Sequence, residues 1–250
     1  MHLTKCFKCL KKRYKHLLTV FIIILPYIGM LSFNIILVLG IFGYLNYPKD
    51  LRINTSLLYY LSVVHNALLV GFSAWIFSSL LFILYDKGIV FQSNYYFQYP
   101  LFDKIIFYFY LSKYYEFFDT FLLYLNGKTP LFLQKYHHIG AVISWHLMWI
   151  YKVDVVWMAS LLNSFVHTIM YLYYLGCLLK INQVRFIKQY ITSLQLVQFF
   201  ILYSNFYFYL PPVETWVNFY VIIFFALYGL GIIYLFGTFY YNNYICKKLR

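Results

Sequence analysis

The stretch Gln134-Lys135-Tyr136-His137-His138 stands at the start of an apolar run that continues to residue 150. Ionisable side chains are unfavourable in apolar membrane spans, and where they occur they usually have a function. The runs on either side contribute further ionisable residues, namely Lys113, Glu116, Asp119 and His167. This clustering predicts a buried polar site that neighbouring helices share.

The composition is that of an integral membrane protein. Of the 250 residues, 63% are hydrophobic and 11% are charged, whereas about a quarter are charged in a typical soluble domain. The mean hydropathy is +0.69. The apolar runs are long and show no strand-like alternation, so the sequence predicts an all-α protein whose helices satisfy their own backbone in lipid.

The apolar runs predict about seven transmembrane helices in a single domain spanning residues 1–250. The first run either crosses once or folds as a hairpin near Pro26, and a basic tail precedes it at residues 1–16. A second basic tail follows at residues 242–250. The runs lie at 17–46, 55–85, 102–125, 131–150, 155–178, 190–208 and 218–241.

The net charge of +13 points to membrane topology, because excess Lys and Arg marks cytosolic loops and anionic lipid contacts. Nucleic-acid binding is excluded, since no polar domain exists to present the charge. Positive loops follow the first, third, fifth and last runs, which predicts a cytosolic C-terminus. The basic N-terminal tail conflicts with this pattern if the first run crosses once. In the opposite loops Asp86, Lys87, Asp103 and Lys104 cancel, as do Lys152 and Asp154.

Polar residues near the end of the third run share one helix face. Lys113, Glu116 and Thr120 follow an i, i+3, i+7 spacing. Asp119 lies beside them, and a lysine with two carboxylates can be partly paired, which lowers the penalty of burial. The alternative for Lys113 and its carboxylates is a purely structural ion pair near the interface.

The polar residues of the next runs add to the predicted site. Gln134 lies one turn before the histidine pair and could orient an imidazole, whereas His146, further along, is interpreted as structural. A polar stripe on the fifth run and two residues on the sixth follow helical spacing: Asn163, His167, Tyr171, Tyr174, Gln195 and Gln198. The pattern predicts a pocket that opens toward the cytosol and continues into the bilayer, which suits a substrate with a charged head and a lipid tail.

Together these motifs resemble the fatty acid elongase (ELO) family over residues 113–198. The resemblance rests on Lys113-x-x-Glu116-x-x-Asp119-Thr120, His137-His138, Asn163-x-x-x-His167-x-x-Met170-Tyr171-x-Tyr173-Tyr174 and Thr192-x-x-Gln195-x-x-Gln198. The family's histidine box usually begins with histidine, and this chain has Gln134 there.

The resemblance implies a seven-helix protein of the endoplasmic reticulum membrane, six of whose helices surround an acyl tunnel. The implied activity is that of an acyltransferase, a very-long-chain 3-oxoacyl-CoA synthase, which condenses acyl-CoA with malonyl-CoA and releases CoA and CO2. No cofactor or metal is implied. The implied partners are the lipid bilayer and the ketoacyl-CoA reductase, dehydratase and enoyl reductase of the cycle; a homodimer is compatible with the family. Lys247 and Lys248 resemble a dilysine retrieval signal, although a positive membrane flank has the same composition.

The residues suggest a histidine nucleophile, because Cys177 lies outside the polar cluster. We expect His137 to form an acyl-imidazole, with Gln134 and His138 orienting it and His167 acting as acid–base or oxyanion partner. Direct condensation without an acyl-enzyme stays open. The residues predicted to bind substrate or support the site are Lys113, Glu116, Asp119, Asn163, Tyr171, Tyr174, Gln195 and Gln198.

Two other functions fit parts of the pattern. A di-iron lipid desaturase or hydroxylase also uses adjacent histidines, but such sites need many ligands. The chain has 7 histidines, two of which lie in the N-terminal tail. A seven-helix receptor or carrier would leave the clustering of ionisable residues unexplained.

Overall fold

The computed structural model describes residues 32–47, 51, 53–91, 94–206 and 215–246. All regular elements in these ranges are helical, which confirms the predicted all-α class. The chain divides into two compact units, Met1–Asn46 and Tyr47–Arg250. One described helix, Ser32–Leu45, belongs to the first unit. The predicted N-terminal tail and the predicted break near Pro26 lie outside the described residues.

The second unit contains helices at all six predicted runs between residues 55 and 241. The run predicted at 102–125 is divided into two helices at Glu116. With the helix Ser32–Leu45, the described helical segments match the seven predicted runs. The helices of the second unit are α2 (Thr55–Lys87), α3 (Pro100–Tyr115), α4 (Phe117–Leu125), α5 (Phe132–Ile150), α6 (Val156–Leu178), α7 (Lys188–Phe206) and α8 (Trp216–Tyr240).

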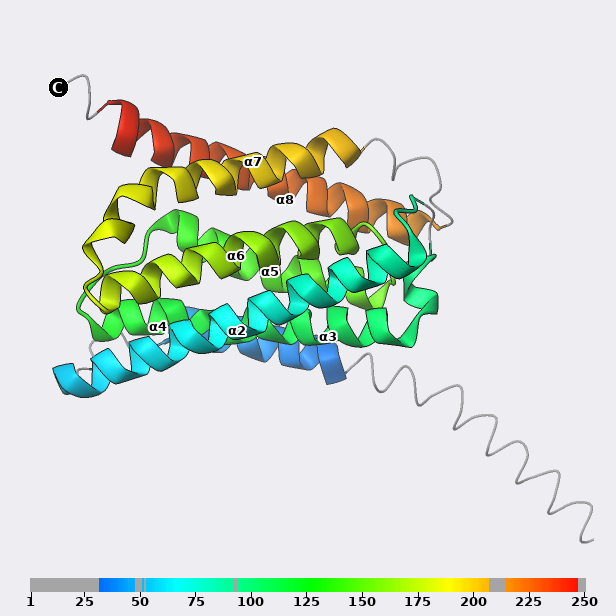
Figure 1. The fold of residues 1–250 in the computed structure, drawn as a ribbon. Helices are drawn as coiled ribbons and strands as arrows, with labels where there is room; N and C mark the ends of the chain where they lie inside the picture. The colour runs from blue at the N-terminus through cyan, green and yellow to red at the C-terminus, as the bar shows by residue number, and fades with distance from the viewer. Residues whose placement is uncertain (1–31, 48–50, 52, 92–93, 207–214, 247–250) are drawn as a thin grey trace, which may run out of the picture. The chain divides into compact units, whose positions relative to one another are not determined.

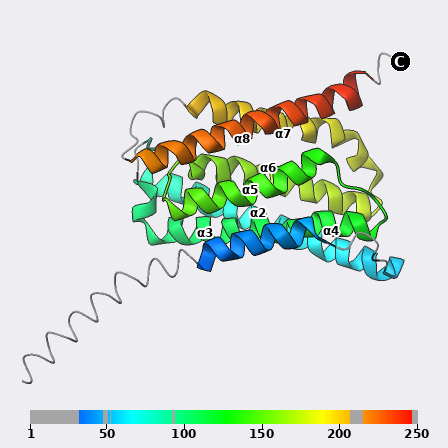
Figure 2. The ribbon, with the colours of Figure 1, turned by 180° about the vertical axis from the view of Figure 1, so that it is seen from behind.

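Six helices of this unit form a closed ring. Around the ring each helix contacts the next in the order α2, α3, α5, α8, α7 and α6. Helix α6 packs along α2 and so closes the ring. Figure 1 shows α2, α6 and α7 on the near side, and Figure 2 shows α3, α5 and α8 on the opposite side. The loops after α4 and α6 lie together at one end of the ring (Figure 1), as the predicted topology requires.

Local sequence signals explain where the helices begin and end. The Asn54 side chain accepts a hydrogen bond from the Ser56 amide at 2.8 Å and so caps α2. Gly88 follows α2 with φ of 77°, a conformation that glycine adopts without steric penalty. Pro100 occupies the first turn of α3, where its missing N–H has no intrahelical partner to lose.

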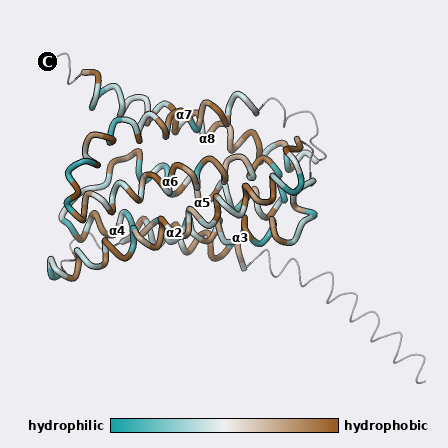
Figure 3. The backbone as a smooth tube through the Cα atoms, viewed as in Figure 1, coloured by the Kyte–Doolittle hydropathy of each residue, from teal (hydrophilic) through white to brown (hydrophobic). Residues whose placement is uncertain are grey.

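Hydropathy along the chain fits a multi-pass membrane protein. Among the described residues, three stretches are long and apolar enough to cross a membrane: Thr55–Lys87, Val156–Leu178 and Trp216–Ile245. The last combines α8 with the π-helix η4 (Tyr241–Ile245). Figure 3 shows apolar residues along the helices and hydrophilic residues gathered toward the ends of the second unit. The interruption at Glu116 and the polar residues on α5 and α7 account for the weaker signal of the other segments.

Two ion pairs form at the end of the ring opposite the α4 and α6 loops. Asp86 and Lys87 form an ion pair with an N–O distance of 2.7 Å. Lys152 pairs with Asp103 at 2.6 Å. Asp154, whose charge offsets that of Lys152 in the same loop, accepts a hydrogen bond from the Tyr96 amide at 3.1 Å. The connection through residues 94–99 thus brings a backbone donor to Asp154.

Candidate active site

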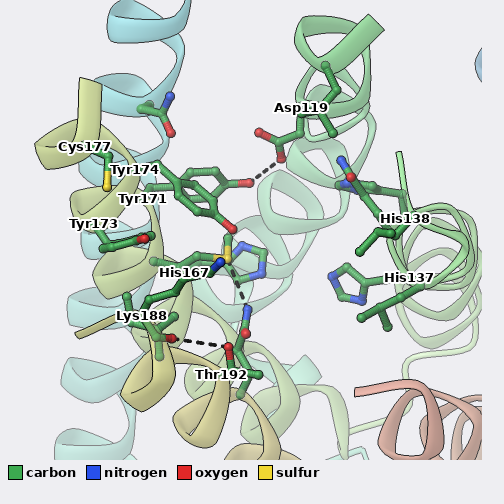
Figure 4. A pocket seen from close by; sticks show the side chains of 18 of the residues that line it. Asp119, His137, His138, His167, Tyr171, Tyr173, Tyr174, Cys177, Lys188 and Thr192 are labelled. Carbon is green, nitrogen blue, oxygen red and sulfur yellow. Dashed lines mark hydrogen bonds between the residues drawn. The ribbon is translucent and has the colours of Figure 1, made fainter. Parts of the chain in front are cut away.

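A cavity of ≈ 580 Å³ lies within the ring. Its wall is built by α2, α4, α5, α6, α7, α8 and the loop after α4. Figure 4 shows His137 and His138 on one side, facing His167, Tyr171 and Tyr174 of α6 on the other. The predicted site residues that line it are Asp119, Gln134, His137, His138, Asn163, His167, Tyr171, Tyr174, Gln195 and Gln198.

Lys113 and Glu116 lie behind the cavity wall and are not among its lining residues. The Lys113 ammonium donates to Glu116 Oε1 and to Asn163 Oδ1, both at 2.8 Å. The ammonium also lies 4.0 Å from the ring centroid of Phe109. These contacts compensate a lysine that is only 1% exposed. Lys113 thus reaches the cavity through Asn163.

Glu116 links this ion pair to a histidine of the cavity. Its Oε1 lies 3.4 Å from Nδ1 of His167, and both side chains are almost fully buried. The position of Glu116 follows from the helix break, since it ends α3 and precedes α4. Non-helical backbone at membrane depth is tolerated where it is buried in protein or lines a cavity.

Asp119 is held by donors from two other helices. Nε2 of His65 on α2 lies 2.8 Å from its Oδ1, and the Tyr171 hydroxyl on α6 donates to Oδ2 at 2.7 Å. Of the two carboxylates expected to pair with Lys113, only Glu116 contacts the lysine in the described structure. Asp119 accepts hydrogen bonds from His65 and Tyr171 instead.

His137 is held by a tyrosine that the sequence analysis did not single out. The Tyr228 hydroxyl lies 3.0 Å from the His137 carbonyl oxygen and 3.2 Å from its Nδ1. The His137 and His167 ring centroids are 6.3 Å apart, and those of His137 and His138 are 5.7 Å apart. Two imidazoles from different helices therefore meet at the same part of the cavity.

The close approach of Tyr228 depends on a glycine. A Cβ atom added at Gly140 would collide with the ring of Tyr228. Close packing at small residues is a main source of helix association in membranes. Gly140 thus lets α8 bring the Tyr228 hydroxyl to the first turns of α5.

The glutamines differ in their partners. Gln134 donates to the Thr120 hydroxyl at 3.2 Å rather than to an imidazole. Gln195 contacts the Met170 sulfur at 3.2 Å, and Gln198 is buried at the wall. Gln134 was predicted to orient a histidine. In the described structure its amide points to α4 and makes no hydrogen bond with an imidazole.

Sequence reasoning did not assign His65, Tyr228, Lys128 or Lys188 to the site. His65 is an ionisable residue in an apolar run, so the rule that marked His167 could also have found it. Exposed Lys128 and Lys188 line the cavity at the end where the α4 and α6 loops lie. His146, interpreted as structural, bonds the Tyr110 hydroxyl at 2.9 Å and does not line the cavity.

Three donors could share a metal ion. One ligand atom each from Glu116, His137 and His167 lies within 4.8 Å of the others. Two histidines and one carboxylate match a mononuclear zinc or iron site. A di-iron site in a helical bundle typically uses four carboxylates and two histidines, and the searched part of the chain brings together one group of three. Lys113 also competes for Glu116.

The fold and cavity define a multi-helix membrane protein with a buried histidine–carboxylate site. The chain belongs to the ELO family (GNS1/SUR4), whose sequence model matches residues 13–250. The family resemblance that the motifs predicted is thereby confirmed, and it extends well beyond residues 113–198.

Curated relatives carry elongase names. Fatty acid elongase sre1 of Dictyostelium discoideum is 43% identical over 97 residues, which cover 38% of this chain and 35% of that protein. Very long chain fatty acid elongase 2 of Rattus norvegicus is 38% identical over 101 residues, 38% of this chain and 36% of the relative. Putative fatty acid elongase 1 of Schizosaccharomyces pombe is 34% identical over 154 residues, which cover 56% of this chain and 46% of that protein. The matches span from about a third to about half of these relatives.

Proposed function

We propose that this protein is the condensing enzyme of fatty acid elongation, which joins acyl-CoA and malonyl-CoA into 3-ketoacyl-CoA with release of CoA and CO2. The observation that carries the proposal is the meeting of His137 and His167 in a buried cavity, with Lys113 and Glu116 behind them. Membership of the ELO family and the elongase names of its relatives support the same reaction class.

The lining of the cavity suits a CoA thioester. Lys128 and Lys188 supply positive charge where the phosphates of CoA would enter. Beyond His137 lies a recess of ≈ 30 Å³, whose lining includes Leu202 and Phe225. We assign the charged end to CoA and the apolar side to the acyl chain.

His137 is the proposed nucleophile, and Tyr228 sets its tautomer. The Tyr228 O–H donates to the His137 carbonyl, so its oxygen can accept the proton on Nδ1. This arrangement leaves the Nε2 lone pair for attack on the acyl thioester. The new bond joins Nε2 to the acyl carbon, the carbon–sulfur bond breaks, and the CoA thiolate takes up a proton.

The second step forms the carbon–carbon bond. Malonyl-CoA loses CO2, and the resulting enolate carbon attacks the acyl carbon; the bond to His137 breaks and restores the imidazole. His167 supplies a donor for the developing oxyanion or the leaving thiolate. Its Nδ1 lies 3.4 Å from Oε1 of Glu116. One proton from solvent completes the balance.

The remaining predicted residues have supporting roles in this proposal. Lys113 orients the Asn163 amide, which lines the cavity. Gln134 acts through Thr120, while His138 and the wall residues Tyr174, Gln195 and Gln198 shape the space around the thioester. The proposed mechanism requires no cofactor and no metal.

We place the protein in the endoplasmic reticulum membrane with a cytosolic C-terminus. The charge pattern of the loops supports this side. The dilysine at Lys247 and Lys248 lies outside the described residues and stays a prediction. The product is a 3-ketoacyl-CoA, so a ketoacyl-CoA reductase, a dehydratase and an enoyl reductase are the partners that would complete the cycle. Homodimerisation stays a prediction of the family.

Turnover of purified protein tests the function. With malonyl-CoA and a panel of acyl-CoAs, we expect equal amounts of CO2 and 3-ketoacyl-CoA, and loss of both in His137→Ala. His146→Gln serves as a matched control, because His146 is buried away from the cavity. Absence of turnover on every acyl-CoA, with the wild-type protein folded, would refute the proposal.

A further inference from the structure

His65 is a buried histidine outside the motifs that define the site. It is 1% exposed and does not line the cavity. Its ring lies among aromatic side chains, with centroids 5.2 Å from Tyr115 and 5.3 Å from Phe118. Its Nε2 makes the 2.8 Å contact with Asp119. Burial of a polar ring among aromatic side chains costs free energy unless a hydrogen bond compensates it. The contact with Asp119 is the hydrogen bond that does so for His65.

The tautomer of His65 follows from its two nitrogens. In the described part of the chain, Nδ1 has no hydrogen-bond partner. The proton therefore belongs on Nε2, where it is donated to the carboxylate. Asp119 then receives one donor on each oxygen, His65 on Oδ1 and Tyr171 on Oδ2. Three helices, α2, α4 and α6, are joined through this carboxylate.

The network ends at a histidine of the proposed mechanism. The Tyr171 ring, fixed by its hydroxyl on Asp119, stands edge-on to His167, with centroids 5.5 Å apart and planes at 82°. Asp119, Tyr171 and His167 all line the cavity (Figure 4).

We propose that His65 is a positioning residue: through Asp119 and Tyr171 it fixes the orientation of the His167 ring in the cavity. The proposal rests on the proposed function only for the reaction that this orientation serves. The effect of His65 on the orientation of His167 follows from the contacts themselves and can be measured without turnover.

Three variants separate positioning from simple stability. His65→Leu removes the donor, whereas His65→Gln keeps an N–H group for Asp119. His146→Leu is the matched control, because it removes another buried histidine, whose Nδ1 contacts the neutral hydroxyl of Tyr110 at 2.9 Å. Each variant is first checked for monodispersity and thermal unfolding in detergent, so that rates refer to folded protein.

Kinetics give the first readout. We expect His65→Leu to lower kcat about tenfold with the KM for acyl-CoA within about twofold, the size expected when a hydrogen bond to a charged group is lost. His65→Gln should recover most of this loss. In the His65→Leu/Tyr171→Phe double variant the losses should not multiply, because both changes break one network. The proposal would be overturned if the kcat losses of the double variant multiply, or if His65→Gln does not recover kcat. It would also be overturned if His146→Leu lowers kcat as much as His65→Leu.

Chemical labelling gives a readout that needs no turnover. Diethyl pyrocarbonate acylates accessible neutral imidazoles, and peptide mapping gives the rate at each histidine. We expect the His167 rate to change at least about threefold in His65→Leu, and to stay near wild type in His65→Gln and His146→Leu. An unchanged His167 rate in His65→Leu would overturn the positioning claim even if the protein condenses acyl-CoA. A wild-type protein without condensing activity would refute the proposed function and leave this measurement valid.

Discussion

At the scale of single residues, the two facing imidazoles are held by different chemistry. The Tyr228 hydroxyl lies 3.2 Å from Nδ1 of His137, and in the proposed mechanism this contact leaves Nε2 for attack. Nδ1 of His167 lies 3.4 Å from the carboxylate of Glu116. The proposed mechanism gives the two histidines complementary roles, one as nucleophile and one as donor.

Removal of the Tyr228 hydroxyl tests the first of these contacts. Tyr228→Phe keeps the ring and loses a hydrogen bond worth about 1 kcal/mol, which corresponds to roughly fivefold in rate. We expect kcat to fall by at least this factor, because the His137 tautomer is no longer fixed. Steady-state kinetics measure it, with Tyr234→Phe, an exposed tyrosine of the same helix, as control. Equal rates for Tyr228→Phe and wild type would contradict the tautomer assignment.

The buried ion pair of Lys113 and Glu116 makes a prediction about stability. Removal of one partner leaves an unpaired buried charge, which typically costs about 3–5 kcal/mol. We expect Lys113→Met and Glu116→Gln each to lower the thermal unfolding temperature in detergent. The Lys113→Met/Glu116→Gln double variant should unfold at a higher temperature than Lys113→Met alone. If the two losses simply add, the pair does not exist as described.

At the scale of the elements, helix packing decides where the site side chains lie. Gly140 on α5 admits the ring of Tyr228 from α8, and the interruption between α3 and α4 turns Glu116 toward His167. The cavity therefore depends on interhelical contacts more than on any one helix.

The contact between α5 and α8 can be tested at Gly140. The added methyl group in Gly140→Ala has no room against Tyr228, so the ring must move away from His137. We expect a loss of kcat at least as large as that of Tyr228→Phe, together with a lower unfolding temperature. Gly71→Ala on α2 is the matched control, because its added Cβ meets open space. Wild-type kinetics for Gly140→Ala would mean that α8 packs differently.

The sequence predicts most elements and part of the site. Long apolar runs locate the helices, and helical spacing brings Asn163, His167 and Tyr171 onto one lining face. The break at Glu116 has no proline or glycine to signal it. The partners His65–Asp119 and Tyr228–His137 are 54 and 91 positions apart, and local periodicity carries no information about contacts between distant helices.

At the scale of the whole second unit, charge differs between the two ends of the ring. Lys128 and Lys188 line the cavity at one end, while the other end holds the pairs Asp86–Lys87 and Asp103–Lys152. This asymmetry agrees with an orientation in which the cavity opens toward the cytosol.

Residue accessibility in intact microsomes tests that orientation. In a chain whose own cysteines are replaced by serine, we expect Lys128→Cys to react with an impermeant maleimide added outside. Lys152→Cys should react only after the membrane is permeabilised. The reverse pattern would place the cavity mouth on the lumenal side and would contradict the assigned topology.

Chelation separates the proposed chemistry from a metal-dependent one. Since histidine performs the acyl transfer in this account, we expect turnover to persist after treatment with EDTA or 1,10-phenanthroline. Loss of activity on chelation, restored by iron or zinc, would instead assign Glu116, His137 and His167 to a metal.

Mass analysis of the protein after incubation with acyl-CoA tests whether His137 is the nucleophile. Protein incubated with acyl-CoA alone is digested and mapped, and a second sample is chased with malonyl-CoA before digestion. We expect an added acyl mass on the peptide that contains His137, absent from His137→Ala and released by malonyl-CoA. An acyl group on another residue, or product formation from protein that never carries an acyl group, would contradict the assignment of His137 as nucleophile.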